Sequence, residues 1–217
     1  MTAQTLKNAL AHELAGRDLL THPFYLRWQA GELRRGELAA YAEQYLYFEA
    51  SLPGLLRRLL TTIDDEAGRT LVQQNLADEE GVPAPHVELF RDFAAGAGAA
   101  AGATATPKTR GLMATYDALV DAGGAQGLAA VVSYEMQAPA IAATKAKGLR
   151  EWYGFDDRAT RFWDLHATMD TSHADWGFEA LARLDAPEPV IVEAARRASD
   201  AWWEFLDERE AEGMRPA

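Results

Sequence analysis

Apolar residues recur along most of the chain at steps of three and four, the spacing of an amphipathic helix. The clearest case is GELAAYAEQYLYFEASLPGLLRRLL, where Tyr41, Tyr45, Phe48 and Leu52 fall on one stripe. Pro53 follows this stripe and predicts a kink or a break in the helix. No segment shows the strict alternation of apolar and polar residues that is typical of a half-buried strand.

Six further segments show the helical pattern. They are DDEAGRTLVQQNLADEE, HVELFRDFAAGAG, TRGLMATYDALVDAGG, AQGLAAVVSYEMQAPAIAATKAKGL, RATRFWDLHATMDTSHADWGFEALARL and PVIVEAARRASDAWWEFLDERE. Pro139 crosses the fourth of these, and Asp156 and Asp157 are expected at the start of the fifth, where the helix dipole favours acids. The low-complexity stretch AAGAGAAAGATATPKT is predicted to be mostly loop. We therefore expect an all-α, single-domain bundle of about seven helices over residues 1–217.

The composition and charge narrow the possible partners. Apolar residues make up 48% of the chain and charged residues 25%, as in an ordinary globular protein. The formal net charge is −12, which disfavours binding to nucleic acid and to anionic membranes. No run approaches the ~20 apolar residues that span a bilayer, and the first residues mix charged and apolar side chains unlike a signal peptide. We expect a cytoplasmic protein.

The chain contains no cysteine. This absence excludes disulfides, zinc–cysteine sites, iron–sulfur clusters and thiol nucleophiles.

Candidate chemistry is concentrated in the stretch HATMDTSH. His166, Asp170 and His173 stand at positions i, i+4 and i+7, which a helix places within roughly a 60° arc. Two imidazoles and a carboxylate on one stripe suit a divalent transition metal such as iron or manganese. The alternative is that all three lie on a polar, solvated helix face.

Two other segments add candidate ligands. Glu79 precedes His86 across the Gly/Pro bend of ADEEGVPAPH, which can bring two helix ends together. Glu135 lies in an otherwise apolar helix, so if buried it must be paired, protonated or bound to metal; alternatively it is simply exposed. Three histidines and three carboxylates suit a two-metal site inside a helical bundle. The Glu-x-x-His pairs of ferritin-like proteins are absent, so such a metal site would be built from a different ligand pattern on a different bundle.

The pattern Glu79-x6-His86, Glu135 in SYEMQAP, and His166-x3-Asp170-x2-His173 resembles the ligand set of the heme-oxygenase-like dinuclear-metal oxidases. The resemblance covers nearly the whole chain and is strongest to the self-sacrificing para-aminobenzoate synthases, within a wider superfamily that includes TenA-like and PqqC-like proteins. It implies a dinuclear Fe/Fe or Fe/Mn centre, with O2 and an external reductant as co-substrates.

The same resemblance assigns roles to three more residues. Tyr25 of HPFYLRW matches the tyrosine whose ring becomes para-aminobenzoate, a folate precursor, and Lys145 of ATKAKGL matches the lysine implicated as amino donor. Tyr41 matches a tyrosine near the family's metal site. Without the resemblance, Tyr25 and Tyr41 would be interpreted as core aromatics and Lys145 as a surface lysine.

Three other functions stay open from the sequence. Related dinuclear-iron oxidases act on small diffusible substrates, and the pyrroloquinoline quinone synthases of this fold are metal-free. The thiamine-salvage branch uses a catalytic cysteine that this chain lacks. The third alternative is a non-enzymatic interaction protein. We also expect a homodimer, to which Trp202 and Trp203 could contribute, although packing within one chain explains this pair equally well.

Overall fold

Helices make up the regular structure of the chain. The computed structural model describes residues 1–81 and 84–214, apart from the side chains of residues 170 and 171, and in this part it contains ten α-helices and no strand. The helices are α1 (Ala3–Glu13), α2 (Pro23–Ala30), α3 (Arg35–Thr62), α4 (Glu66–Glu79), α5 (His86–Ala97), α6 (Pro107–Ala122), α7 (Gly124–Glu135), α8 (Ala138–Tyr153), α9 (Asp157–Ala182) and α10 (Glu188–Gly213). Two short 3₁₀ turns, Leu14–Arg17 and Leu19–Thr21, connect α1 to α2. The predicted all-α class is confirmed.

The helix count exceeds the expected seven for two reasons. The helices α1 and α2 are short and lie outside the seven segments with a clear helical pattern. The segment expected as one helix across Pro139 is divided into α7 and α8 at residues 136 and 137. Pro139 lies in the first turn of α8, where its missing N–H breaks no helical hydrogen bond.

The prolines differ in their effect on the helices. Contrary to the break that we considered at Pro53, α3 continues through this residue to Thr62. Pro53 has no N–H to donate to the carbonyl of Glu49, four residues earlier, so α3 lacks one backbone hydrogen bond there. The packing of α3 along its whole length compensates for this loss, because its apolar stripe is buried.

Several helix ends match the sequence signals. Asp156 caps α9 and accepts a hydrogen bond from the Ala159 amide at 2.9 Å, as expected for an acid at this helix start. Asp65 caps α4 in the same way through the Gly68 amide at 2.6 Å. The low-complexity segment between α5 and α6 is a loop over residues 98–106.

The short helix α2 is held at both ends, which matters because it carries Tyr25. His22 caps its start, its Nδ1 accepting from the Phe24 amide at 3.1 Å. Gly31 ends it with φ 72°, and a Cβ at this residue would lie 2.5 Å from Trp152 Cγ. Only glycine suits both the left-handed backbone and this close approach.

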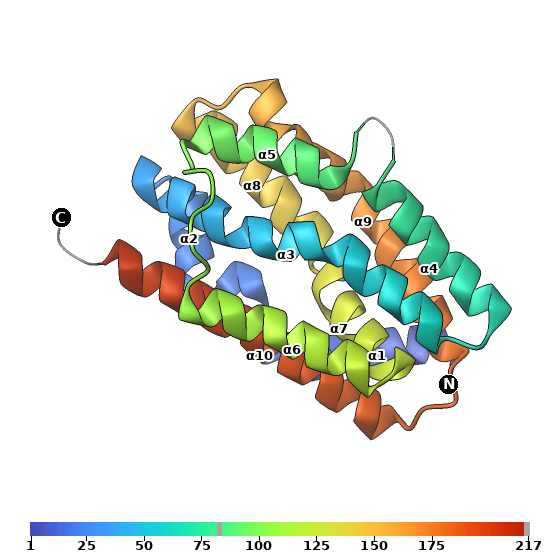
Figure 1. Cartoon of the computed structure of the whole chain (residues 1–217). Coiled ribbons are helices and arrows are strands. Elements are labelled where there is room, and N and C mark those ends of the chain that lie inside the picture. Colours follow the sequence, from blue (N-terminus) through green and yellow to red (C-terminus); the bar gives the residue numbers. More distant parts are fainter. Residues whose placement is uncertain (82–83, 215–217) are drawn as a thin grey trace.

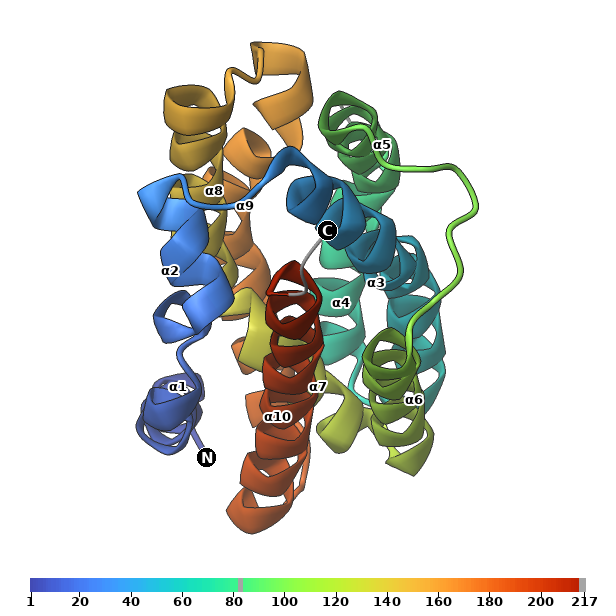
Figure 2. The same cartoon turned by 90° about the vertical axis from the view of Figure 1, so that its left-hand side faces the viewer.

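The arrangement of the helices encloses one interior region (Figures 1 and 2). α9 packs against α4, α5, α7 and α8, while α3 packs against α4, α5, α6 and α7. α10 lies beside α6 and α7 and close to the N-terminal helices. Polar side chains from α3, α4, α5, α7 and α9 can therefore meet inside the bundle.

The C-terminal tryptophans pack within the chain. Trp202 is fully buried and its Nε1 donates to the Tyr116 hydroxyl at 3.0 Å. Trp203 is half-buried, with its ring 4.7 Å from that of His22. None of the helices in the described part of the chain combines the length and the apolar character needed to cross a membrane.

Candidate metal centre

The bend between α4 and α5 brings together the first two predicted ligands. Glu79 is the last residue of α4 and His86 the first residue of α5, and both side chains are buried. His86 Nδ1 lies 3.0 Å from Glu79 Oε2, but the angles of this contact do not fit a hydrogen bond, and among the described residues His86 Nε2 has no hydrogen-bond partner either. Such polar atoms buried without hydrogen bonds are costly unless a missing group satisfies them.

His166 reaches the same region from α9. Its Nδ1 lies 2.8 Å from the carbonyl oxygen of Phe162. Because a carbonyl can only accept, Nδ1 carries the hydrogen, and the neutral ring has its lone pair on Nε2. Burial lowers the pKa of His166 to about 4, so the ring is neutral at physiological pH. A backbone carbonyl that orients an imidazole in this way is typical of metal-binding histidines.

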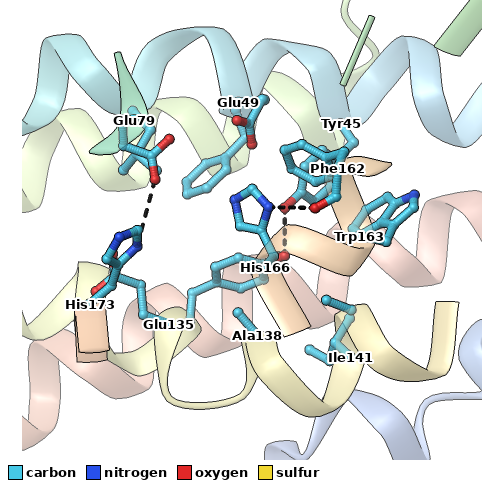
Figure 3. A pocket seen from close by; sticks show the side chains of 14 residues that line it. Tyr45, Glu49, Glu79, Glu135, Ala138, Ile141, Phe162, Trp163, His166 and His173 are labelled. Carbon is cyan, nitrogen blue, oxygen red and sulfur yellow. Dashed lines mark hydrogen bonds and ion pairs between the residues drawn. The ribbon is translucent and has the colours of Figure 1, made fainter. Parts of the chain in front are cut away.

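His173 lies two turns further along α9 and faces the other side of Glu79 (Figure 3). Its Nδ1 is 3.9 Å from Glu79 Oε1, and its Nε2 is 3.2 Å from Oδ2 of Asp78. Burial disfavours ionisation of Glu79, but the neighbouring His86, His166 and His173 outweigh it and hold the pKa of this carboxyl below its usual value. Glu79 is therefore a carboxylate, with His173 on one side and His86 and His166 on the other.

Glu135 enters from the C-terminal end of α7. Its Oε1 accepts a hydrogen bond from Asn75 Nδ2 at 2.7 Å, whereas its buried Oε2 has no hydrogen-bond partner. Burial raises the pKa of this carboxyl. The predicted burial of this glutamate is confirmed, so the exposed alternative is wrong.

Close contact between α7 and α9 depends on Gly177. A Cβ at this position would lie 2.3 Å from Val132 Cγ1 and 3.8 Å from Glu135 Oε2. The missing side chain lets α9 approach α7, and so brings Glu135 toward His173. Asp170, the remaining predicted ligand, belongs to α9, but its side chain lies outside the described residues.

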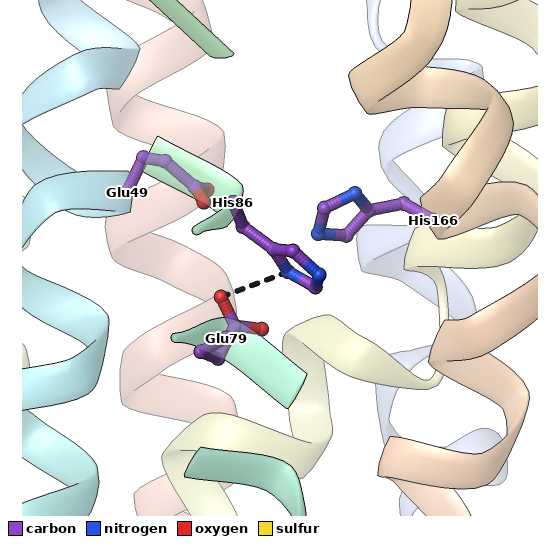
Figure 4. Close-up of side chains that lie close together, drawn as sticks. All are labelled: Glu49, Glu79, His86 and His166. Atoms are coloured by element: carbon purple, nitrogen blue, oxygen red, sulfur yellow. Dashed lines mark ion pairs between the residues drawn. The ribbon is translucent and has the colours of Figure 1, made fainter. Parts of the chain in front are cut away.

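The sequence interpretation missed one residue of this region, Glu49 of α3. Its carboxylate is buried, and Oε1 has no hydrogen-bond partner. One ligand atom each from Glu49, Glu79, His86 and His166 lie within 4.8 Å of one another (Figure 4). A signal was present, because Glu49 follows Tyr45 by four residues and precedes Leu52 by three, which places it on the core stripe of its helix.

The donor set fits a metal centre. Three buried carboxylates, Glu49, Glu79 and Glu135, surround a region with three buried imidazoles, and no Lys or Arg in the described residues forms an ion pair with these three carboxylates. Mixed nitrogen and oxygen donors suit iron and manganese. The cavity between these side chains has a volume of about 20 Å³, which is room for about one water-sized molecule.

A second buried cluster contains the predicted reactive residues. The Tyr25 hydroxyl lies 3.0 Å from that of Tyr41, and the Tyr41 hydroxyl lies 2.5 Å from Lys145 Nζ. All three side chains are fully buried, so the surface interpretation of Lys145 is wrong. Burial holds the pKa of Lys145 well below its ordinary value and raises that of Tyr25. The amine is therefore biased toward its neutral, nucleophilic form.

One layer of aromatic rings separates the two clusters. Lys145 Nζ lies 4.1 Å from the ring centroid of Trp163 and 5.2 Å from that of Tyr45. Trp163 and Tyr45 also line the cavity beside His166 (Figure 3). The Tyr45 hydroxyl lies 2.6 Å from that of Tyr134, which borders Glu135 in sequence. The two clusters are thus neighbours across shared walls.

Comparisons with known proteins agree with this geometry. The family model described as "Iron-containing redox enzyme" matches residues 39–203. Proteins named 4-aminobenzoate synthase are similar over nearly the whole chain. That of Nitrosomonas europaea is 36% identical, covering 95% of this chain and 92% of the relative. That of Chlamydia pneumoniae is 30% identical, covering 91% of each chain.

The fold comparison confirms the expected architecture. A solved structure from Shewanella denitrificans is described as a domain of unknown function with a heme oxygenase-like fold. It superposes with a TM-score of 0.79 at 15% identity, covering 98% of this chain and 93% of that one.

Proposed function

The chain belongs to the family of iron-containing redox enzymes, and from this premise we propose that it makes 4-aminobenzoate from its own Tyr25. The chain is accordingly an oxidoreductase, and the non-enzymatic alternative is set aside. Relatives at 30–36% identity that carry the name 4-aminobenzoate synthase support the proposed product.

One observation carries the internal-substrate proposal. The phenol of Tyr25 and the amine of Lys145 lie against the same Tyr41 hydroxyl, at 3.0 and 2.5 Å. This cluster shares two wall residues, Tyr45 and Trp163, with the candidate metal centre. A ring and an amine held in place beside an oxidising centre react without the entropic cost of bringing them together.

The difference between tyrosine and the product defines the chemistry required. 4-Aminobenzoate is a benzene ring with a carboxylate opposite an amine, whereas the tyrosine ring carries a methylene carbon opposite a hydroxyl. The conversion cleaves the Cα–Cβ bond of Tyr25 and oxidises Cβ to a carboxylate. It also replaces the ring C–O bond by a C–N bond, so the ring oxygen leaves as water and the Cε–Nζ bond of a lysine donor is broken. A bound Fe/Fe or Fe/Mn pair would supply the oxidising power for these steps from O2 and an external reductant.

The protein's own residues hold the reactants. We assign Glu79, His86, Glu135, His166, Asp170 and His173 as the residues that would hold the metal ions. Tyr41 positions the Tyr25 hydroxyl and the Lys145 amine and can pass a proton between them. Lys145, biased toward the neutral amine by burial, is assigned as the nitrogen donor.

The cavity argues against a diffusible organic substrate. Its volume of about 20 Å³ accommodates one water-sized molecule but no free amino acid, fatty acid or quinone precursor. Its apolar walls, among them Phe48, Leu52 and Phe162, are buried core residues and not parts of an open cleft. A small gas such as O2 matches this space better, and the ring of Tyr25 lies outside the cavity, on the far side of Tyr45 and Trp163.

The test uses protein whose tyrosines carry ring label. The metal-free chain is loaded anaerobically with Fe(II), with and without Mn(II), and then receives O2 and reductant. We expect labelled 4-aminobenzoate, at most one molecule per chain, with a matching mass loss at Tyr25 in the intact protein.

Tyr25→Phe and Tyr47→Phe form a matched pair of variants. Tyr47 is partly exposed and donates to the Ala103 carbonyl, away from the centre. Tyr25→Phe should yield no product, whereas Tyr47→Phe should match the wild type. Unlabelled product, or full yield from Tyr25→Phe, would refute the internal-substrate proposal.

A further inference from the structure

We propose that Glu49 is an additional metal ligand, contributed by α3, which shares one ion with Glu79, His86 and His166. The inference rests on the metal centre of the proposed function and extends it. The ligand set implied by the sequence resemblance draws on α4, α5, α7 and α9 and includes no residue of α3.

The geometry of the four side chains supports a shared ion. They come from four different helices and their carboxylates and rings converge (Figure 4). One ligand atom of each lies within 4.8 Å of all the others. Ligands about 2.0–2.2 Å from a common ion are at most about 4.4 Å apart, so small side-chain adjustments suffice.

The burial of Glu49 points to the same role. Only 3% of this residue is exposed, and Oε1 has no hydrogen-bond partner among the residues that the structure describes. No ion pair in the described part of the chain includes Glu49. A buried carboxylate without hydrogen bonds or a counter-charge is costly, and a bound cation compensates it.

The surroundings in α3 argue against a structural role. Glu49 stands on the core stripe between Tyr45 and Leu52, where an apolar side chain would pack without this cost. Its carboxylate borders the cavity together with that of Glu79. Two carboxylates facing one small space repel each other, so one of them must take up a proton unless a cation lies between them.

A ligand from α3 makes the two metal positions unequal. The position near Glu49 has two carboxylates and two imidazoles, whereas the other is lined by Glu135 and His173 with Glu79 shared between them. Because anionic ligands strengthen the binding of divalent cations, loss of the Glu49 carboxylate is expected to weaken binding of the ion near it and to leave the other ion almost unaffected.

The test is an anaerobic Mn(II) titration of the metal-free chain, with unbound Mn(II) counted by its EPR signal. We expect the wild type to bind two ions in two distinguishable steps. Glu49→Gln and Glu49→Leu should weaken one of the two steps at least tenfold and leave the other within about twofold. Glu43→Gln is the matched control, because Glu43 lies on the same helix but bonds to the Ala100 amide.

Thermal unfolding separates a ligand from a structural residue. In chelator, Glu49→Leu should unfold at the same temperature as the wild type or higher, because an unpaired buried carboxylate has been removed. With Mn(II), its rise in Tm should be smaller than that of the wild type. A structural role predicts the opposite, a lower Tm in chelator and an unchanged rise with Mn(II).

Two results would overturn the assignment: unchanged Mn(II) affinity at both steps in both variants, or a weakened step matched by a lower Tm in chelator. Neither depends on product formation. A wild type that binds two Mn(II) ions and yet, loaded with iron, makes no 4-aminobenzoate would count against the proposed function alone.

Discussion

Lys145 combines complete burial with a hydrogen bond to a single phenol, Tyr41, in the midst of five aromatic rings. An ordinary structural lysine keeps its ammonium in water. Here burial depresses the pKa, and the side chain contributes an amine at the cost of stability. This pattern is typical of a reactive lysine.

Lys145→Met should separate the effect of this residue on stability from its proposed role as nitrogen donor. The apolar side chain fills a similar volume and removes the cost of a buried amine, so the free energy of unfolding should stay the same or rise. Labelled 4-aminobenzoate should drop to the background level. Lys147→Met is the control, since Lys147 is exposed on the same helix and pairs only with Glu151 at 3.8 Å. Full product from Lys145→Met would exclude it as the nitrogen donor.

At the residue level, the sequence predicted most but not all of the buried side chains that could bind metal. Five of the six residues predicted as ligands converge inside the bundle, and the side chain of Asp170 lies outside the described residues. The histidines and Glu135 stood out because such residues are rare in apolar helices. Glu49 did not stand out, because it is one of three acids in a long helix and such acids are usually solvated. Its place on the core stripe becomes decisive only once the neighbouring helices are known.

At the level of elements, the long helices were predictable and their interruptions were not. The strong periodicity of α3 and α9 sufficed to identify them. Pro139 separates α7 from α8, whereas Pro53 lies inside α3, and the two prolines look alike in sequence. The difference arises from tertiary packing, because α3 has buried partners along its length that outweigh one missing hydrogen bond.

Gly177→Ala tests the contact between α7 and α9. The new methyl group would clash with Val132, so the free energy of unfolding in urea should fall by about 1–3 kcal/mol. Displacement of Glu135 from His173 should also weaken the binding of one Mn(II) ion.

Gly111→Ala provides the matched control for this substitution. Gly111 lies in α6, and a Cβ added there would have no neighbouring side chain or other helix within 4 Å, so alanine should raise stability by roughly 0.5–1 kcal/mol. Equal effects of the two substitutions would show that the α7–α9 contact has no special role.

For the whole molecule, the bundle is built around buried carboxyl groups as well as an apolar core. Glu49, Glu79 and Glu135 are all buried near one small cavity. The aromatic core stabilises the fold enough to keep them there. Metal binding should therefore be a major source of stability as well as of chemistry.

Loading the chain with Mn(II) at about 100 times the dissociation constant should stabilise it by about 2.7 kcal/mol per ion. This corresponds to a rise in Tm of roughly 5–10 °C per ion for a domain of this size. Differential scanning fluorimetry with and without chelator measures the shift. Mg(II), which prefers oxygen ligands in an octahedron, should give little change. A Tm that does not respond to Mn(II) would contradict the metal centre.

The complete burial of Tyr25 has a consequence for the fate of the molecule. Excision of its ring would leave an empty space in the core, and truncations of large buried aromatics commonly cost about 3–5 kcal/mol. That is a large part of the roughly 5–15 kcal/mol by which most domains are folded. A chain that has reacted would thus be less stable and more easily digested by proteases. The amount of 4-aminobenzoate formed would then be limited by the number of newly synthesised chains.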